Sequence, residues 1–139
     1  MHFVCYLTQS NISIFYKTFF FCFSDVPDAP DAPKVTNITE STMTVKWRAP
    51  SDGGARITNY ILEKQDRFST RWTKVTQDEI LITEFTVTGL TKGTEYLYRV
   101  SAENKAGVGK PSPPSEAHIA KPQFGKFVMA DFLLVVSCM

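Results

Sequence analysis

Apolar and polar side chains alternate along the middle of this 139-residue chain, and this period of two constrains its fold more than any other feature. The clearest case is Glu95–Asn104, in which Tyr96, Tyr98, Val100 and Ala102 occupy every second position. Successive side chains of an extended strand point to opposite faces of a sheet. The pattern therefore predicts a strand with one face in a core and the other turned towards solvent.

Shorter segments repeat the same alternation. Residues 42–48 place Met43, Val45 and Trp47 on one face. Stretches that contain glycine and proline, such as residues 50–54, separate the segments as tight turns do. Further strands are expected at residues 58–64, 71–76, 84–88 and 116–120. Many short strands without a helical period predict an all-β sandwich or barrel.

Large side chains on these strands would close over one interior. Burial of an aromatic side chain removes about 150–250 Å² from water, so a few of them can hold a small domain together. The residues expected to meet there are Trp47, Tyr60, Phe85, Tyr96 and Tyr98. All three cysteines, Cys5, Cys22 and Cys138, lie outside this region. A domain without disulfides suits a reducing compartment.

The two ends of the chain differ from the middle in composition. We expect a leader or non-native extension at residues 1–25, one domain at residues 26–122, and an apolar C-terminal extension at residues 123–139. The favoured interpretation of both ends is translated non-coding sequence or a fragmentary gene model. A weak signal peptide is the alternative for the first part, although Lys17 interrupts its apolar stretch. Both apolar runs are shorter than the about 20 residues that span a membrane, so membrane association is not expected.

The net charge and the absence of known motifs argue against nucleic-acid binding, metal binding and catalysis. The formal net charge is +1, which gives no general attraction to nucleic acid or anionic lipid. His118 has no cysteine or second histidine at ligand spacing, so we expect no metal site. Neither a phosphate-binding motif nor a nucleophile motif occurs. We therefore expect no cofactor and no enzymatic activity.

Several of these residues together resemble a fibronectin type III domain: Pro33, Trp47, Trp72, the turn at residues 50–54, and the Tyr-x-Tyr-x-Val-x-Ala-x-Asn run that ends at Asn104. The resemblance implies a seven-stranded immunoglobulin-like β-sandwich. Leu90 and Tyr96 look like the tyrosine corner of this family, in which the hydroxyl bonds an upstream backbone group. The structural core expected on these grounds is Trp47, Tyr60, Trp72, Leu90, Tyr96 and Val100.

Finer features are similar to the domains of titin-type and twitchin-type giant muscle proteins. They are the Asp52-Gly-Gly turn, the strand at residues 59–64 and the turn at residues 102–107. This resemblance implies a mechanical spacer and scaffold in the sarcomere, within the cytoplasm. Its partners would be thick-filament proteins and neighbouring immunoglobulin or fibronectin-type modules. The alternative is a module of a secreted or cell-surface adhesion or receptor protein, because extracellular members share much of the pattern.

Both interpretations place binding on exposed loops. The candidate protein-binding residues are Asp52, Gly53, Arg56, Asn104, Lys105 and Lys110. A further candidate area is the outward face of the strands, which carries Lys46, Arg48, Arg99 and Glu103. Another is a basic area that could meet an acidic partner, formed by Arg67, Arg71 and Lys74. Asn37-Ile-Thr39 fits the N-glycosylation sequon, whose use would require secretion.

Overall fold

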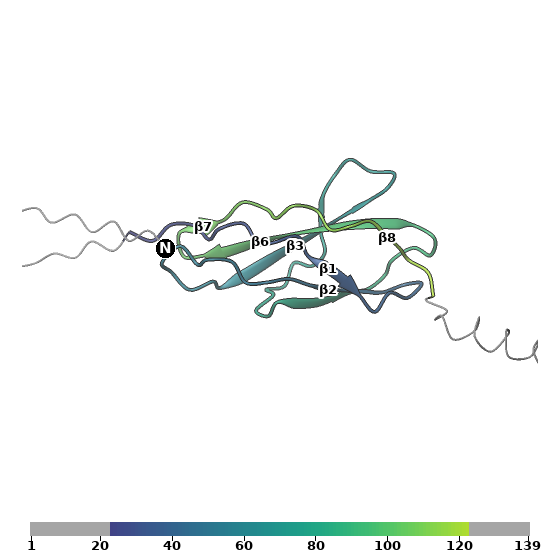
Figure 1. Cartoon of the computed structure of the whole chain (residues 1–139), viewed down its shortest axis with the longest axis horizontal. Helices are drawn as coiled ribbons and strands as arrows, with labels where there is room; N and C mark the ends of the chain where they lie inside the picture. The colour runs from purple at the N-terminus through teal and green to yellow at the C-terminus, as the bar shows by residue number, and fades with distance from the viewer. Residues whose placement is uncertain (1–22, 123–139) are drawn as a thin grey trace, which may run out of the picture.

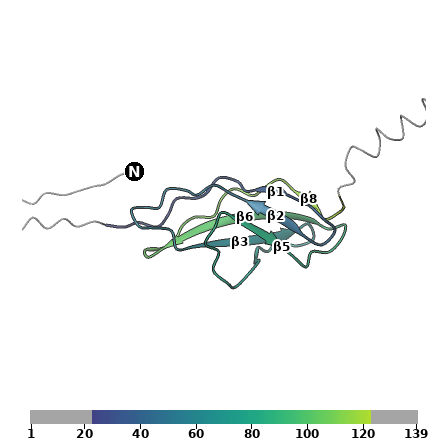
Figure 2. The same ribbon diagram turned by 90° about the horizontal axis from the view of Figure 1, so that it is seen from below.

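The computed structural model describes residues 23–122, which form two β-sheets packed face to face (Figure 1, Figure 2). The described segment enters at one end of the long axis and leaves at the other (Figure 1). Its strands are β1 (Lys34–Thr36), β2 (Met43–Lys46), β3 (Asn59–Asp66), β4 (Thr73–Lys74), β5 (Glu84–Val87), β6 (Glu95–Asn104), β7 (Gly107–Val108) and β8 (His118–Ile119). The predicted all-β sandwich is confirmed, and the described residues contain no helix.

The smaller sheet has the strand order β1-β2-β5, and the larger sheet has the order β4-β3-β6-β7, with β8 also paired to β6. The β3–β6 ladder is the longest and joins eight antiparallel residue pairs. In the smaller sheet Val45 lies opposite Val35 on one side and Phe85 on the other. Because register decides which face each side chain takes, this pairing turns the apolar sets of both sheets towards one interior.

One edge of the larger sheet is a single strand in two parts, β7 and β8. Between them lies Pro-Ser-Pro-Pro-Ser at residues 111–115, and proline has no N–H to give to a ladder. The hydroxyls of Ser112 and Ser115 instead accept the backbone N–H groups of Val100, at 3.1 Å, and Tyr98, at 3.0 Å. The N–H groups of the two serines donate to the carbonyls of the same residues at 2.8 Å. Pairing with β6 thus continues across the prolines, and β7 with β8 completes a sandwich of seven strands.

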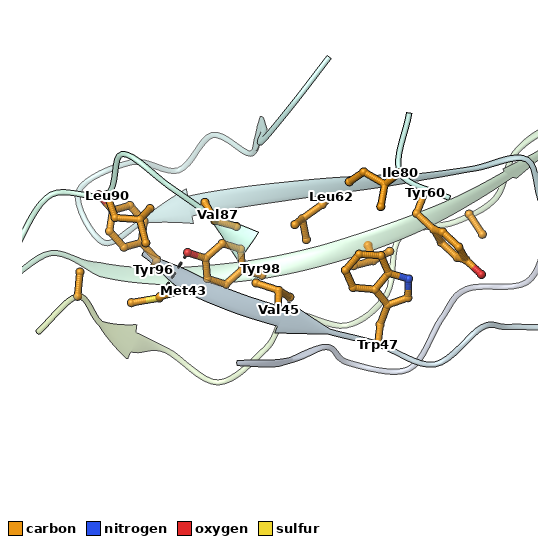
Figure 3. Close-up of a cluster of buried hydrophobic side chains, with 13 residues drawn as sticks. Met43, Val45, Trp47, Tyr60, Leu62, Ile80, Val87, Leu90, Tyr96 and Tyr98 are labelled. Atoms are coloured by element: carbon orange, nitrogen blue, oxygen red, sulfur yellow. Dashed lines mark hydrogen bonds between the residues drawn. The ribbon is translucent and has the colours of Figure 1, made fainter. Parts of the chain in front are cut away.

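Side chains from both sheets fill the interior (Figure 3). Five of the expected core residues lie buried in it: Trp47, Tyr60, Leu90, Tyr96 and Val100. At one end of the core, Trp47 and Tyr60 meet edge to face with 5.5 Å between their ring centroids (Figure 3). Leu90 and Tyr96 lie together at the other end (Figure 3). The remaining members of the cluster are Met43, Val45, Leu62, Ile80, Val87, Tyr98, Ala102 and Ala120.

Trp72 does not lie in this core, and its placement there was wrong. The side chain is half-buried on the outer face of the larger sheet, where the Arg99 guanidinium lies 4.5 Å from the centre of its ring. The cause is the register of β4, in which Lys74 lies opposite Glu63 on the outer face. Trp72 is two residues before Lys74 and therefore faces outward too, whereas Val75 packs against the core.

Other boundaries also differ from those expected. The short strands β1 and β7 were not anticipated, and the last strand includes two residues instead of residues 116–120. Asp25, the last residue of the expected leader, is bonded to the sandwich, because its N–H donates to the carbonyl of Gly53 at 2.9 Å. Residues 1–22 of the expected leader and the C-terminal extension at residues 123–139 lie outside the described residues.

Candidate protein-binding surfaces

Asn104 connects three parts of the chain at the pole where the described segment begins. Its side chain amide donates to the carbonyls of Asp25 at 2.7 Å, Asp52 at 2.8 Å and Ala55 at 3.3 Å. Its Oδ1 accepts the N–H of Ala106 at 2.8 Å. Asn104 is only 4% exposed, so it is a buried cross-link and not the free recognition group that the sequence indicated. We call this set of bonds, centred on Asn104, the N-terminal clamp.

Two glycines allow the first described segment to lie against the neighbouring loops. Gly53 has a φ of +66°, and a Cβ there would collide with the carbonyl oxygen of Asp25. A Cβ on Gly109 would collide with the carbonyl oxygen of Pro27. Only glycine leaves room for backbone to approach backbone so closely. Gly53, a predicted binding residue, is therefore required for packing at this pole.

The other candidate loop residues divide into one structural residue and three free ones. Asp52 accepts the N–H of Gly54 through Oδ1 at 2.9 Å, which fixes the turn. Arg56, Lys105 and Lys110 are exposed, and none of them forms an ion pair within residues 23–122. These three cations are the part of the predicted loop set that a partner could reach.

Charged side chains on the outer faces of the sheets are largely paired with one another. On the smaller sheet Lys46 lies 3.3 Å from Glu84, and both side chains are about half exposed. On the larger sheet Arg99 and Glu63 lie opposite each other in the β3–β6 register, with 2.6 Å between Nε and Oε2. Arg48 remains exposed without an ion pair among the described residues. The outward face therefore offers less free charge than its sequence suggests.

Two buried tyrosines differ in their hydrogen bonds. The hydroxyl of Tyr96 accepts the N–H of Thr91 at 3.1 Å, which is the tyrosine corner expected from the resemblance. The hydroxyl of Tyr98 donates to the Sδ of Met43 at 3.4 Å (Figure 3). Burial raises the pKa of Tyr98 above the ordinary tyrosine value, and the neighbouring Tyr96 adds to this. Burial also raises the pKa of Tyr60.

Neither a metal site nor a membrane-spanning helix is found among residues 23–122. Within residues 23–122, no group of three or more His, Cys, Asp and Glu side chains is placed to hold a metal ion. The same residues include no helix of the length and apolar character that crossing a membrane requires. A depression of about 250 Å³ near β8 is lined by Glu95, His118 and Lys121 among others. Its volume is below the roughly 300–1,000 Å³ of small-molecule pockets.

Residues 28–118 match the family model of the fibronectin type III domain. The chain belongs to the fibronectin type III family. The match extends from the first described segment to His118 at the start of β8, so it covers both sheets. This family consists of non-catalytic modules, which agrees with a fold that presents loops and sheet faces.

Several relatives of this fibronectin type III chain are muscle proteins. It is 35% identical to titin of Drosophila melanogaster over 96 residues. These residues are 68% of this chain and, to the nearest percent, 0% of titin. It is 42% identical to human cardiac-type myosin-binding protein C over 93 residues, and the match covers 66% of this chain and 7% of that protein. A crystal structure of titin domains A168–A170 superposes with a TM-score of 0.68 at 44% identity, over 76% of this chain and 36% of the titin fragment. The chain thus spans a small part of the length of these relatives.

Proposed function

We propose that this chain is a structural and protein-binding module of a titin-like sarcomeric protein, in which it acts as a mechanical spacer and scaffold. The observation that carries the proposal is that the described segment enters and leaves at opposite poles of the sandwich (Figure 1, Figure 2). Modules built in this way can be joined end to end, and each then adds its long axis to the length of the array.

Tension between the two poles would load the strands along their length. Hydrogen bonds between antiparallel strands are perpendicular to the strands, so a pull along β1 shears its pairing with β2. The N-terminal clamp and the bond from the Asp28 N–H to the Ser51 carbonyl, at 3.0 Å, add to the resistance at this pole. At the other pole the carbonyl of Ala120 accepts the N–H of Gly93 at 2.7 Å. Bonds that must break together keep the unfolding rate under load low, and that rate determines mechanical stability.

The relatives support a muscle setting for this module. Titin and cardiac-type myosin-binding protein C are both long proteins of which the chain matches a small part. The proposed location is accordingly the sarcomere, in the cytoplasm. The proposed partners are neighbouring immunoglobulin or fibronectin-type modules and thick-filament proteins such as myosin. Arg56, Lys105 and Lys110 are the exposed cations that such partners would meet at the N-terminal pole.

Single-molecule force spectroscopy tests the mechanical role. The full chain would be placed between marker domains of known unfolding force and stretched through its ends. We expect a discrete unfolding event that lengthens the chain by roughly 30 nm, the contour of about 100 residues. Loss of the clamp in Asn104→Ala should lower the force of this event, while Lys105→Ala should leave it unchanged. A chain that extends without a force peak would contradict the proposal.

A module of a secreted or cell-surface protein is the second candidate, and one observation favours it. Asn37, in the sequon Asn37-Ile38-Thr39, is exposed and has a φ of +47° in the turn between β1 and β2. A glycan could be attached there without entering the core. Mass spectrometry of the chain isolated from its native tissue decides between the candidates. An unmodified Asn37 is expected for the sarcomeric module, and an occupied one would mark passage through the secretory route.

A further inference from the structure

The loop between β3 and β4 presents an aromatic ring to solvent among basic residues. Phe68 is 88% exposed, the largest value among the exposed large apolar side chains of the described residues. Arg67 and Arg71 flank it in the sequence, and Lys74 follows in β4. No acidic residue lies between Arg67 and Lys74, although the formal charge of the whole chain is only +1. We call residues 67–74 the basic aromatic loop.

Hydrogen bonds within the loop hold its backbone in one shape. The N–H of Phe68 donates to the Oδ1 of Asp66 at 3.0 Å, and the N–H of Arg71 donates to the Oγ of Ser69 at 3.1 Å. The side chain amide of Gln65 donates to the carbonyl of Ser69 at 2.9 Å. Phe68 is therefore displayed by an ordered turn, which reduces the conformational entropy that a partner must remove on binding.

The base of the loop is fixed by the outer face of the larger sheet. The Trp72 ring packs against the guanidinium of Arg99, with 4.5 Å between the ring centroid and the guanidinium carbon. Arg99 is in turn held by Glu63 across the β3–β6 ladder. The Arg99 and Glu63 side chains are 27% and 19% exposed, so this stack forms a firm support beneath the end of the loop.

The cations of the loop are poorly neutralised by the domain itself. Arg71 and Lys74 form no ion pair within residues 23–122. Arg67 is 71% exposed, and its ion pair with Glu95 is long, with 3.8 Å between Nη1 and Oε2. The nearest acid in sequence, Asp66, accepts the N–H of Phe68 through Oδ1 and forms no ion pair with Arg67, Arg71 or Lys74, so its single negative charge leaves most of their charge unbalanced. A local excess of positive charge therefore remains for a ligand of opposite charge.

We propose that the basic aromatic loop is a docking site for an acidic protein segment that carries an apolar side chain. An apolar group of the partner would cover Phe68, and its carboxylates would meet Arg67, Arg71 and Lys74. Aromatic and arginine side chains dominate the binding energy of protein interfaces, whereas one exposed ring with three cations is little for a lipid surface. This site is separate from the N-terminal clamp and goes beyond the spacer role.

The test uses the full chain and a short fluorescein-labelled peptide of alternating Glu and Leu, with a Lys and Leu peptide as control. Fluorescence anisotropy gives the affinity, and amide chemical shifts locate the site. We expect the acidic peptide to shift the amides of residues 66–74. Phe68→Ala and Arg71→Glu should each weaken binding about ten-fold, as loss of a strong interface residue does. Raising the salt from about 0.1 M to about 1 M should also weaken binding, because it shortens the Debye length from about 10 Å to about 3 Å.

Two matched variants control for general loss of apolar surface and of charge. Leu81 is 70% exposed in another loop, and Arg48 is exposed just after the end of β2, so Leu81→Ala and Arg48→Glu should bind as the wild type does. The inference is overturned if the acidic peptide does not bind, if it binds Phe68→Ala and Arg71→Glu with wild-type affinity, or if only phosphatidylserine vesicles bind. Since Phe68 and Arg71 lie outside the clamp, both variants should keep the wild-type unfolding force, which separates this test from that of the mechanical role.

Discussion

Replacing Asn104 with alanine should remove the N-terminal clamp and leave the hydrophobic core intact. The substitution deletes two short bonds from the amide nitrogen, at 2.7 Å and 2.8 Å, and one to Oδ1 at 2.8 Å, besides a longer one at 3.3 Å. Each hydrogen bond contributes roughly 0.5–1.5 kcal/mol net, so the free energy of unfolding should fall by about 2–4 kcal/mol. That is a large fraction of the about 5–15 kcal/mol by which domains are stable.

Urea denaturation of the full chain, followed by tryptophan fluorescence, measures this change at constant m-value. Lys105→Ala is the matched control, because this neighbouring side chain is exposed and should change stability by less than about 0.5 kcal/mol. Asn104→Asp keeps the size of the side chain but turns an acceptor towards carbonyl groups, so at neutral pH it should destabilise at least as much as alanine. The reasoning is refuted if both Asn104 variants remain within about 0.5 kcal/mol of the wild type.

Further changes separate the other contributions to stability, each measured by denaturation of the full chain. Trp47→Ala should cost about 3–5 kcal/mol, and a variant that melts within a few degrees of the parent would contradict its burial. Tyr96→Phe should cost about 1 kcal/mol, while Tyr98→Phe should cost less, because sulfur is a weak acceptor. Gly53→Ala should destabilise the domain more than Gly93→Ala. Both glycines have a positive φ, but only at Gly53 would the added Cβ collide with backbone atoms, so equal losses of stability would count against that collision. Stability should fall as the pH rises above about 10, because the unfolded chain then releases the Tyr98 proton that the folded state retains, with a slope of at most about 1.4 kcal/mol per pH unit for this proton. An unchanged slope in Tyr98→Phe would contradict that assignment.

The parts of the fold that sequence predicts best are those in which one side of a strand is fully covered. The apolar residues of β6 that alternate from Tyr96 to Ala102 are all buried, because the smaller sheet covers their face, although Ser101 on the other face is buried too. The tyrosine corner was expected from the resemblance to the family, and the hydroxyl of Tyr96 accepts the N–H of Thr91, five residues away. Alternation alone predicts a strand well where the other sheet covers one of its faces.

The parts that sequence missed depend on distant partners. Asn104 reads as a loop asparagine because its partners Asp25 and Asp52 lie far away in the chain. Trp72 reads as a core residue because large aromatic side chains are usually buried, yet Arg99 of another strand gives it a place outside. The pairing of Ser112 with β6 is hidden because prolines next to it argue against a strand.

The direction of pulling tests the central claim most directly. In a chain whose native cysteines are replaced by serine, force would be applied through Ser24→Cys and Lys121→Cys, or through Ser24→Cys and Lys105→Cys. The first pair loads the sandwich from pole to pole, and the second lies at one pole, where it peels the first segment from the β6–β7 turn. The account predicts a clearly higher unfolding force for the first pair at the same loading rate. Equal forces in the two directions would show that the arrangement of the ends gives this module no special resistance to tension.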